Sequence, residues 1–203
     1  MTACRGRAGM VLAALALVGS ACGPARSAST QPQQDAVSTT GKTAALVRAA
    51  ALSPCPASAA PAGKVPDVTL PCLGGGAPVR LARLARLGQP TVLNLWATWC
   101  RECAAELPML AGMATQLKGR VVFVGVDTGD SADNALQMLT EAGVHYPNVY
   151  DRRSQLVKKL GLPGLPATVL VRADGTVAYT KLGALAGEVE LRNLMGTYLG
   201  VSA

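Results

Sequence analysis

The segment 91–108 joins a strand-like run to two cysteines and a helix. Residues 91–97 are apolar and rich in Val and Leu, which predicts a buried strand. Cys100 and Cys103 follow, and apolar residues recur at helical spacing from Leu107 onward. The cysteines should therefore lie in the first turn of a helix, where unpaired N–H groups and the helix dipole favour a thiolate. Their separation places both sulfurs on one side of that turn. This pattern predicts a reversible dithiol.

A structural disulfide or half of a metal site would use the same two residues. A zinc site needs two further ligands at matching spacing, and the chain has one histidine, His145. His145 stands in a loop before Tyr146 and Pro147, and we expect it to be structural or solvent-facing. The sequence therefore predicts no metal site.

The composition excludes one class of partner. Hydrophobic residues make up 50% of the 203 residues, while aromatic residues make up only 3%. The core must therefore consist mainly of Ala, Leu and Val. The net charge of +7 is dispersed along the chain. Binding to nucleic acid would need a continuous basic face with aromatic residues for stacking, so no nucleic-acid partner is predicted.

The N-terminal segment has the features of an export signal. Residues 1–21 contain two arginines, then an uncharged stretch of 11 residues at 8–18, then small residues before Cys22. This stretch is short for a membrane span, which needs about 20 residues. The end resembles a bacterial lipobox, although Gly19 departs from its preferred aliphatic residue. We expect a signal peptide at 1–21 and lipidation of Cys22, with an uncleaved signal anchor as the alternative. Either places the protein at the outer face of the cytoplasmic membrane, where disulfides persist.

The remaining chain divides into a tether and one folded domain. Residues 22–63 are rich in Ala, Ser, Thr, Gln and Pro and have no hydrophobic period, which predicts a flexible tether after the lipidated cysteine. Only residues 44–52 could become transiently helical. The folded domain is expected at 64–203.

Strand and helix patterns alternate through this domain. A hairpin is predicted at 65–81 around a glycine-rich turn, and another at 166–181 around Asp174 and Gly175. The remaining expected strands cover 91–97, 120–126 and 146–150, and the expected helices cover 81–87, 100–117, 132–142, 153–160 and 186–199. Such β-α-β units with an antiparallel hairpin predict an α/β fold with a central mixed sheet flanked by helices.

Together these residues resemble the membrane-anchored, extracytoplasmic thioredoxin-like proteins of the TlpA/ResA type. The resemblance covers about 64–201. Its markers are the segment 94–103 around the cysteines, Glu106 and Pro108 after it, and the segment 161–168 downstream. It implies a thioredoxin-like fold with an N-terminal β-hairpin and a β-α insertion.

The resemblance also implies a substrate-binding set. Pro166 corresponds to the family's cis-proline, which would leave the Leu165 backbone open to pair with a substrate strand. A trans proline at a strand entry is the alternative. Trp96 is expected in the core, and Trp99 is expected to cover the dithiol. Trp99, Leu165 and Pro166 are therefore the predicted substrate-binding residues.

The two cysteines and a nearby acid are the predicted catalytic residues. Cys100, nearer the helix start and more exposed, should be the attacking thiolate, and Cys103 should resolve the mixed disulfide. The resemblance places an active-site acid at Glu106, which could accept a proton from a thiol, although it could equally stabilise the first turns of the helix. Asn94 lies where thioredoxin has a buried acid. Arg101 favours a Cys100 thiolate while the neighbouring acids oppose it, so the direction of electron flow stays open.

Cys55 and Cys72 lie outside the resemblance. A bond between them would close a loop of 16 intervening residues and contribute roughly 3 kcal/mol by loop-entropy reasoning. We expect a structural disulfide, with a second redox pair or two thiols as alternatives.

The leading functional hypothesis is an extracytoplasmic thiol-disulfide oxidoreductase that needs no cofactor. The resemblance implies reduction of disulfides in exported proteins, such as the haem-site cysteines of apocytochrome c, with electrons from a membrane donor of the CcdA type. A disulfide-forming oxidant and a Cu(I) chaperone that uses Cys100 and Cys103 are the alternatives. Peroxidase activity is not favoured, because no Pro and Thr precede Cys100 in the peroxidatic arrangement.

Overall fold

The computed structural model describes residues 37–38, 40–56, 63–84 and 88–201. The predicted signal peptide, Cys22 and the first part of the expected tether lie outside the described residues. Among the residues that are described, the search for a helix of sufficient length and apolar character to cross a membrane found none.

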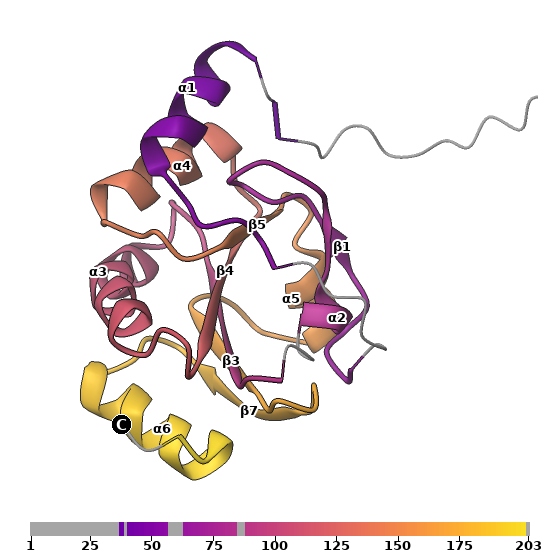
Figure 1. The fold of residues 1–203 in the computed structure, drawn as a ribbon, viewed down its shortest axis with the longest axis vertical. Helices are drawn as coiled ribbons and strands as arrows, with labels where there is room; N and C mark the ends of the chain where they lie inside the picture. Colours follow the sequence, from indigo (N-terminus) through magenta and orange to yellow (C-terminus); the bar gives the residue numbers. More distant parts are fainter. Residues whose placement is uncertain (1–36, 39, 57–62, 85–87, 202–203) are drawn as a thin grey trace, which may run out of the picture. The chain divides into compact units, whose positions relative to one another are not determined.

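A five-stranded sheet forms the centre of the fold (Figure 1), with the strand order β5-β4-β3-β6-β7. Strand β3 pairs in parallel with β4 and antiparallel with β6, so the sheet is mixed, as predicted. Strand β4 is parallel to β5, and β6 is antiparallel to β7. The strands are β3 (Thr91–Trp96), β4 (Val122–Thr128), β5 (Asn148–Asp151), β6 (Ala167–Val171) and β7 (Val177–Leu182).

Helices cover both faces of this sheet. Helices α4, α3 and α6 lie on one side, while α2, α5 and the β1-β2 hairpin lie on the other (Figure 1). The elements are β1 (Thr69–Leu70), β2 (Val79–Arg80), α2 (Leu81–Leu84), α3 (Arg101–Gln116), α4 (Ala132–Glu141), α5 (Gln155–Leu160) and α6 (Glu188–Leu199).

Alternation along the strands creates two hydrophobic cores. On β3, Val92 and Trp96 pack with the helices α3, α4 and α6, whereas Leu93 and Leu95 pack with the hairpin and α5. Successive side chains of a strand point to opposite faces, and all six positions of β3 are buried. A central strand that is buried on both faces explains the continuous apolar run in the sequence.

The expectation of a flexible tether is wrong for residues 41–50. Gly41–Ala50 form helix α1, which lies beside α4 (Figure 1). Ala50 is fully buried, and the Thr43 hydroxyl donates a hydrogen bond to Asp133 of α4 at 2.6 Å. This helix overlaps the predicted transient helix at 44–52 and begins three residues earlier. Leu46 and Val47 pack against the core together with the buried Ala50, so tertiary contacts stabilise this short helix.

The segment after α1 is also fixed to the domain. The backbone N–H of Ser53 donates to the His145 carbonyl at 2.7 Å, and the His145 ring nitrogen Nδ1 lies 3.2 Å from the Ala50 carbonyl oxygen. His145 is therefore structural, as expected. The folded unit begins before residue 64, because these contacts belong to residues that were assigned to the tether.

Several predicted boundaries move by a few residues. Strand β4 begins at Val122 instead of Arg120, and helix α5 begins at Gln155 instead of Arg153. Ser131 is the N-cap of α4, because its hydroxyl accepts the Asn134 N–H at 3.3 Å. Gly161 ends α5 in the left-handed conformation, as predicted.

Candidate active site

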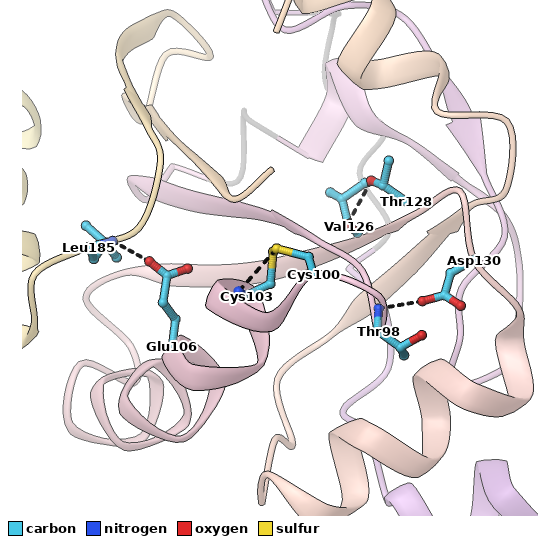
Figure 2. The surroundings of a disulfide bond; sticks show 8 residues. All are labelled: Thr98, Cys100, Cys103, Glu106, Val126, Thr128, Asp130 and Leu185. Atoms are coloured by element: carbon cyan, nitrogen blue, oxygen red, sulfur yellow. Dashed lines mark hydrogen bonds between the residues drawn. A yellow bond between two sulfur atoms is a disulfide. The ribbon is translucent and has the colours of Figure 1, made fainter. Parts of the chain in front are cut away.

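The two cysteines stand at the junction of β3 and α3. Strand β3 ends at Trp96, the backbone turns so that the Cys100 N–H meets the Ala97 carbonyl at 3.2 Å, and Cys100 then becomes the N-cap of α3. Cys100 and Cys103 form a disulfide, and the Cys103 N–H points at the Cys100 sulfur at 3.2 Å (Figure 2).

This junction favours negative charge on one sulfur. A backbone N–H and the N-terminal end of a 16-residue helix both face Cys100, and each lowers the free energy of a thiolate. Cys100 is 5% exposed and Cys103 is 1% exposed in the disulfide. The predicted order of exposure is therefore present, although the difference is small.

Glu106 lies one helical turn beyond Cys103 and is 5% exposed. Its Oε1 accepts the Leu185 N–H from the loop between β7 and α6 (Figure 2), while its Oε2 is buried and has no partner among the described residues. Burial raises the pKa of Glu106 above its ordinary value, and the Leu185 hydrogen bond and the Lys181 charge oppose that rise. A carboxyl group with one uncommitted buried oxygen can accept or donate a proton.

The loop between β4 and α4 fixes the turn that precedes Cys100. The Thr98 N–H donates to Asp130 Oδ2 at 2.6 Å (Figure 2), and the Ser131 N–H donates to Asp130 Oδ1 at 2.7 Å. Asp130 was not among the predicted site residues. Its contact with Thr98 could not be predicted, because it depends on how two loops from neighbouring strands meet.

Trp99, which was expected to cover the dithiol, lies largely at the surface. Its side chain is 65% exposed, and its indole N–H donates to the Gly129 carbonyl at 3.2 Å. Trp96, in contrast, is fully buried, as expected. The hydrogen bond to the β4-α4 loop keeps the exposed indole beside the active-site turn, where it is available to a bound molecule.

The other two predicted substrate-binding residues precede β6. The Leu165–Pro166 peptide bond is cis, as the resemblance implied. Pro166 is buried and its carbonyl accepts the Gly183 N–H at 3.0 Å, while Leu165 is half-buried. Gly183 begins the same loop that reaches Glu106 through Leu185.

Asp127 is an ionisable residue to which the sequence assigned no role. It ends up opposite Trp96 across the parallel β3-β4 pair and is 0% exposed. Burial raises the pKa of Asp127 to about 9, with smaller contributions from the charges of Asp130 and Asp151. Neither of its oxygens has a hydrogen-bond partner within the described ranges.

Cys55 and Cys72 form a second disulfide. It joins the segment after α1 to the loop between β1 and β2, where Cys72 forms an isolated β-bridge with Val149 of β5. No group of three or more His, Cys, Asp and Glu side chains in the described part of the chain is placed to hold a metal ion.

Comparison with known proteins places this site in a family. A family model described as the AhpC/TSA family matches residues 61–180, more than half of the chain. The chain belongs to the AhpC/TSA family. The match includes both cysteines of α3, Glu106 and the cis-proline, and it ends before the loop that contacts Glu106.

Curated relatives of this AhpC/TSA chain are named as thiol:disulfide interchange proteins. DsbE of Vibrio cholerae is 36% identical over 111 residues, which cover 54% of this chain and 56% of the relative. CycY of Rhizobium leguminosarum is 36% identical over 97 residues, 47% of this chain and 51% of the relative. The chain thus spans little more than half the length of these relatives.

A solved structure is similar over a larger share. A secreted Mycobacterium tuberculosis disulfide oxidoreductase, described as homologous to E. coli DsbE, is 27% identical with a TM-score of 0.55, over 66% of this chain and 96% of that one. The predicted thioredoxin-like fold is confirmed: a mixed five-stranded sheet flanked by helices, with a small N-terminal hairpin.

Proposed function

We propose that this protein is an extracytoplasmic thiol-disulfide oxidoreductase in which Cys100 and Cys103 are the redox pair. The observation that carries the proposal is the Cys103 N–H aimed at the Cys100 sulfur, within a bonded pair at the start of a helix. The names of the relatives, thiol:disulfide interchange proteins and a disulfide oxidoreductase, support it.

In the reductive direction, the Cys100 thiolate attacks one sulfur of a substrate disulfide. The substrate S–S bond breaks, a bond between Cys100 and the substrate forms, and the first substrate sulfur leaves as a thiolate that takes up a proton. Cys103 then loses its proton and attacks Cys100, which closes the disulfide seen here and releases the second substrate thiolate. Two electrons pass to the substrate, and a dithiol donor must return them.

Glu106 is the group that we propose to receive the proton of Cys103. It stands one turn away on the same helix, it is buried, and one of its oxygens has no partner in the described structure. Its raised pKa makes it a better proton acceptor at neutral pH than an exposed carboxylate.

We propose that substrates bind across the exposed Trp99 and the segment Leu165–Pro166. An exposed indole offers apolar contact area, and the backbone before a cis-proline can pair with an extended chain. The partners would be exported proteins with disulfides, for example apocytochrome c, and a membrane electron donor of the CcdA type, both by resemblance. The predicted export signal at 1–21 and the secreted M. tuberculosis relative support an extracytoplasmic location. Lipidation of Cys22, or an uncleaved signal anchor, would hold the protein at the outer face of the cytoplasmic membrane.

The reduction potential decides the direction. Equilibration with glutathione buffers, followed by quantification of the Cys100–Cys103 disulfide, should give a value near about −270 mV for a reductase, whereas a value near about −120 mV would indicate a disulfide-forming oxidant. The double variant Cys55→Ser/Cys72→Ser should show the same reduction potential for Cys100–Cys103.

Exchange itself is tested with a model disulfide substrate. The parent should reduce it, Cys100→Ala should not, and Cys103→Ser should accumulate a mixed disulfide through Cys100, from which the natural substrate can be identified. Reduction by Cys100→Ala at the parental rate would overturn the proposal. Stoichiometric copper in anaerobically purified protein, together with no exchange, would indicate the chaperone instead.

A further inference from the structure

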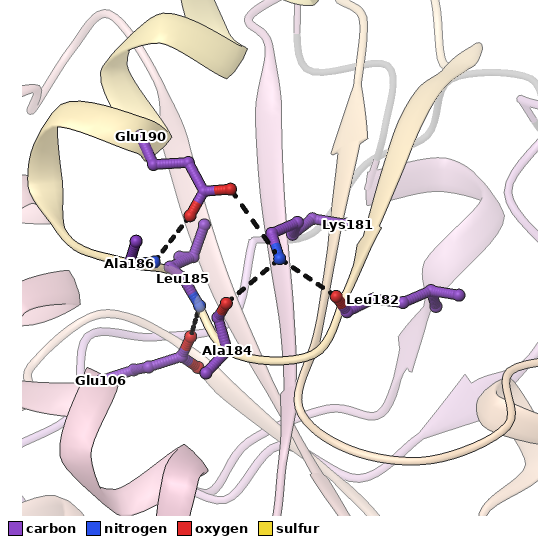
Figure 3. Close-up of polar contacts among 7 residues, drawn as sticks. All are labelled: Glu106, Lys181, Leu182, Ala184, Leu185, Ala186 and Glu190. Atoms are coloured by element: carbon purple, nitrogen blue, oxygen red, sulfur yellow. Dashed lines mark hydrogen bonds and ion pairs between the residues drawn. The ribbon is translucent and has the colours of Figure 1, made fainter.

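Three charged side chains hold the loop between β7 and α6 at three consecutive residues (Figure 3). The Lys181 ammonium donates to the Ala184 carbonyl at 3.1 Å, Glu106 accepts the Leu185 N–H, and Glu190 accepts the Ala186 N–H at 2.6 Å. These side chains come from β7, α3 and α6. We refer to residues 182–186 as the Glu106 loop.

Lys181 makes the largest number of these contacts. It also donates to the Leu182 carbonyl at 3.1 Å, and its Nζ lies 3.8 Å from Glu190 Oε1 (Figure 3). Its side chain is partly buried, and its backbone pairs with Thr168 of β6. A rigid strand thus carries the ammonium group, and that group fixes the carbonyl immediately before the Leu185 N–H.

The Leu185 side chain completes the arrangement. It is buried in the core that also contains Cys100, Cys103 and Leu107. The loop is therefore fixed by an apolar anchor at Leu185 and by a cation at Ala184, so that the Leu185 N–H is directed at Glu106.

We propose that Lys181 is a positioning residue for Glu106: by holding the Glu106 loop, it presents the Leu185 N–H to the carboxylate and supplies the nearest positive charge. This inference rests on the proposed function, in which Glu106 takes the proton of Cys103. The contacts of the Lys181 ammonium are with Leu182, Ala184 and Glu190, so it acts on Glu106 through the loop.

The charges around Glu106 have opposing effects. Burial raises its pKa, the Leu185 N–H and Lys181 lower it, and Glu190 raises it. Burial raises the pKa of Tyr146, which precedes β5, and the charge of Glu106 raises it further. Cys100 and Cys103 lie at the start of α3, the helix that carries Glu106. Lys181 and Glu190 should therefore shift the protonation of Glu106 in opposite directions.

The test measures the pKa of Glu106 in the oxidised protein from its carboxyl ¹³C shift. Lys181→Met should raise it by about 0.5 to 1 pH unit, because a cation and an aligned donor are lost. Glu190→Gln should lower the Glu106 pKa, because it removes a negative charge that raises this pKa. Glutamine can still accept the Ala186 N–H, so the loop keeps this contact. Lys181→Arg should restore the parental value, and Lys118→Met, an exposed lysine beyond the other end of α3, should not change it.

The second readout is the pH profile of Cys100 alkylation in the reduced protein. Its inflection should move in the same directions as the Glu106 pKa in Lys181→Met and Glu190→Gln, and neither substitution should move it in a Glu106→Gln background. An unchanged Glu106 pKa in folded Lys181→Met would overturn the inference, even if the protein exchanges disulfides normally. Shifted values in a protein that exchanges no disulfide would overturn the proposed function and support the Lys181 contact alone.

Discussion

Asn148 accepts the indole N–H of Trp96 through its Oδ1 at 3.0 Å, and both side chains are completely buried. The same asparagine donates from Nδ2 to the Tyr146 carbonyl, and its own carbonyl oxygen lies 3.4 Å from the Cys55 sulfur. Gly125 makes room for it, since a Cβ there would come within 1.7 Å of Oδ1. Asn148 therefore connects the active-site strand to the second disulfide.

Replacing this asparagine should destabilise the fold. Asn148→Leu keeps a similar volume but leaves the buried Trp96 N–H without an acceptor, which costs about 1–3 kcal/mol. Urea denaturation of the oxidised protein measures the loss. Asn193→Leu, on the exposed surface of α6, is the matched control and should change the free energy of unfolding little. Equal midpoints for the two variants would contradict the structural role of Asn148.

Much of the fold was predictable from local patterns. The Val- and Leu-rich run before Cys100 and the helical spacing after it predicted β3 and α3, and Asp174 with Gly175 predicted the β6-β7 turn. These signals are local, because burial on both faces of a strand or one face of a helix is visible in the sequence itself. Helix α1 was predicted only as a transient helix, because the contacts that fix it come from α4 and from the loop before β5, and its own sequence does not show them.

The burial of α1 can be tested with neighbouring alanines. Ala50→Asp would place a charge at a fully buried position, and it should lower the free energy of unfolding by about 3 kcal/mol or more. Ala49→Asp changes the adjacent, exposed residue of the same helix and should have an effect below about 0.5 kcal/mol. If the two variants unfold alike, α1 does not pack on the domain as described.

The second disulfide should stabilise the protein without taking part in exchange. Cys55 and Cys72 are 17 residues apart, and a loop of that size corresponds to about 3 kcal/mol. Cys55→Ser/Cys72→Ser should therefore unfold at lower urea concentration while the folded variant retains disulfide exchange through Cys100. Loss of exchange in the folded variant would show that the pair has a redox role.

Glu106 should control the pH dependence of exchange. Glu106→Gln keeps an acceptor for the Leu185 N–H but cannot take a proton, and we expect the exchange rate near neutral pH to fall by about 10²-fold. Because the pKa of Glu106 is raised by burial, the exchange rate of the parent should increase with pH as the group deprotonates. The Glu106→Gln variant should lack this increase. Glu141→Gln, at an exposed position at the end of α4, is the control. A parental profile in Glu106→Gln would exclude Glu106 as the base.

The site was only partly predictable. Cys100, Cys103, Glu106 and Pro166 belong to short motifs that can be recognised in one sequence. The contacts of Asp130 with Thr98 and of Lys181 with Ala184 join loops whose relative position depends on strand register and loop path. A sequence alone does not specify either, and an aspartate after a strand is usually a helix cap or a solvated residue.

Asp127 illustrates the same limit and gives the clearest pH prediction. Its pKa is about 9 in the folded protein against an ordinary value of 3.8, because burial penalises its charged form. Between these values the folded state holds a proton that the unfolded state has lost. The free energy of unfolding should therefore fall as pH rises, by at most about 1.4 kcal/mol per pH unit from this group. The stabilisation from Asp127 is complete below its ordinary pKa of 3.8 and is lost as pH rises through its folded-state pKa of about 9.

Asp127→Asn removes this titration and should stabilise the protein more at about pH 8 than at about pH 5, as measured by urea denaturation at both values. Asp174→Asn is the control: the Thr176 N–H holds the pKa of this exposed carboxyl below its ordinary value, so its contribution changes only at more acidic pH. If Asp127→Asn and the parent show the same dependence of unfolding free energy on pH, Asp127 is ionised in the folded protein. The buried carboxyl opposite Trp96 would then need a cation or donor beyond those described here.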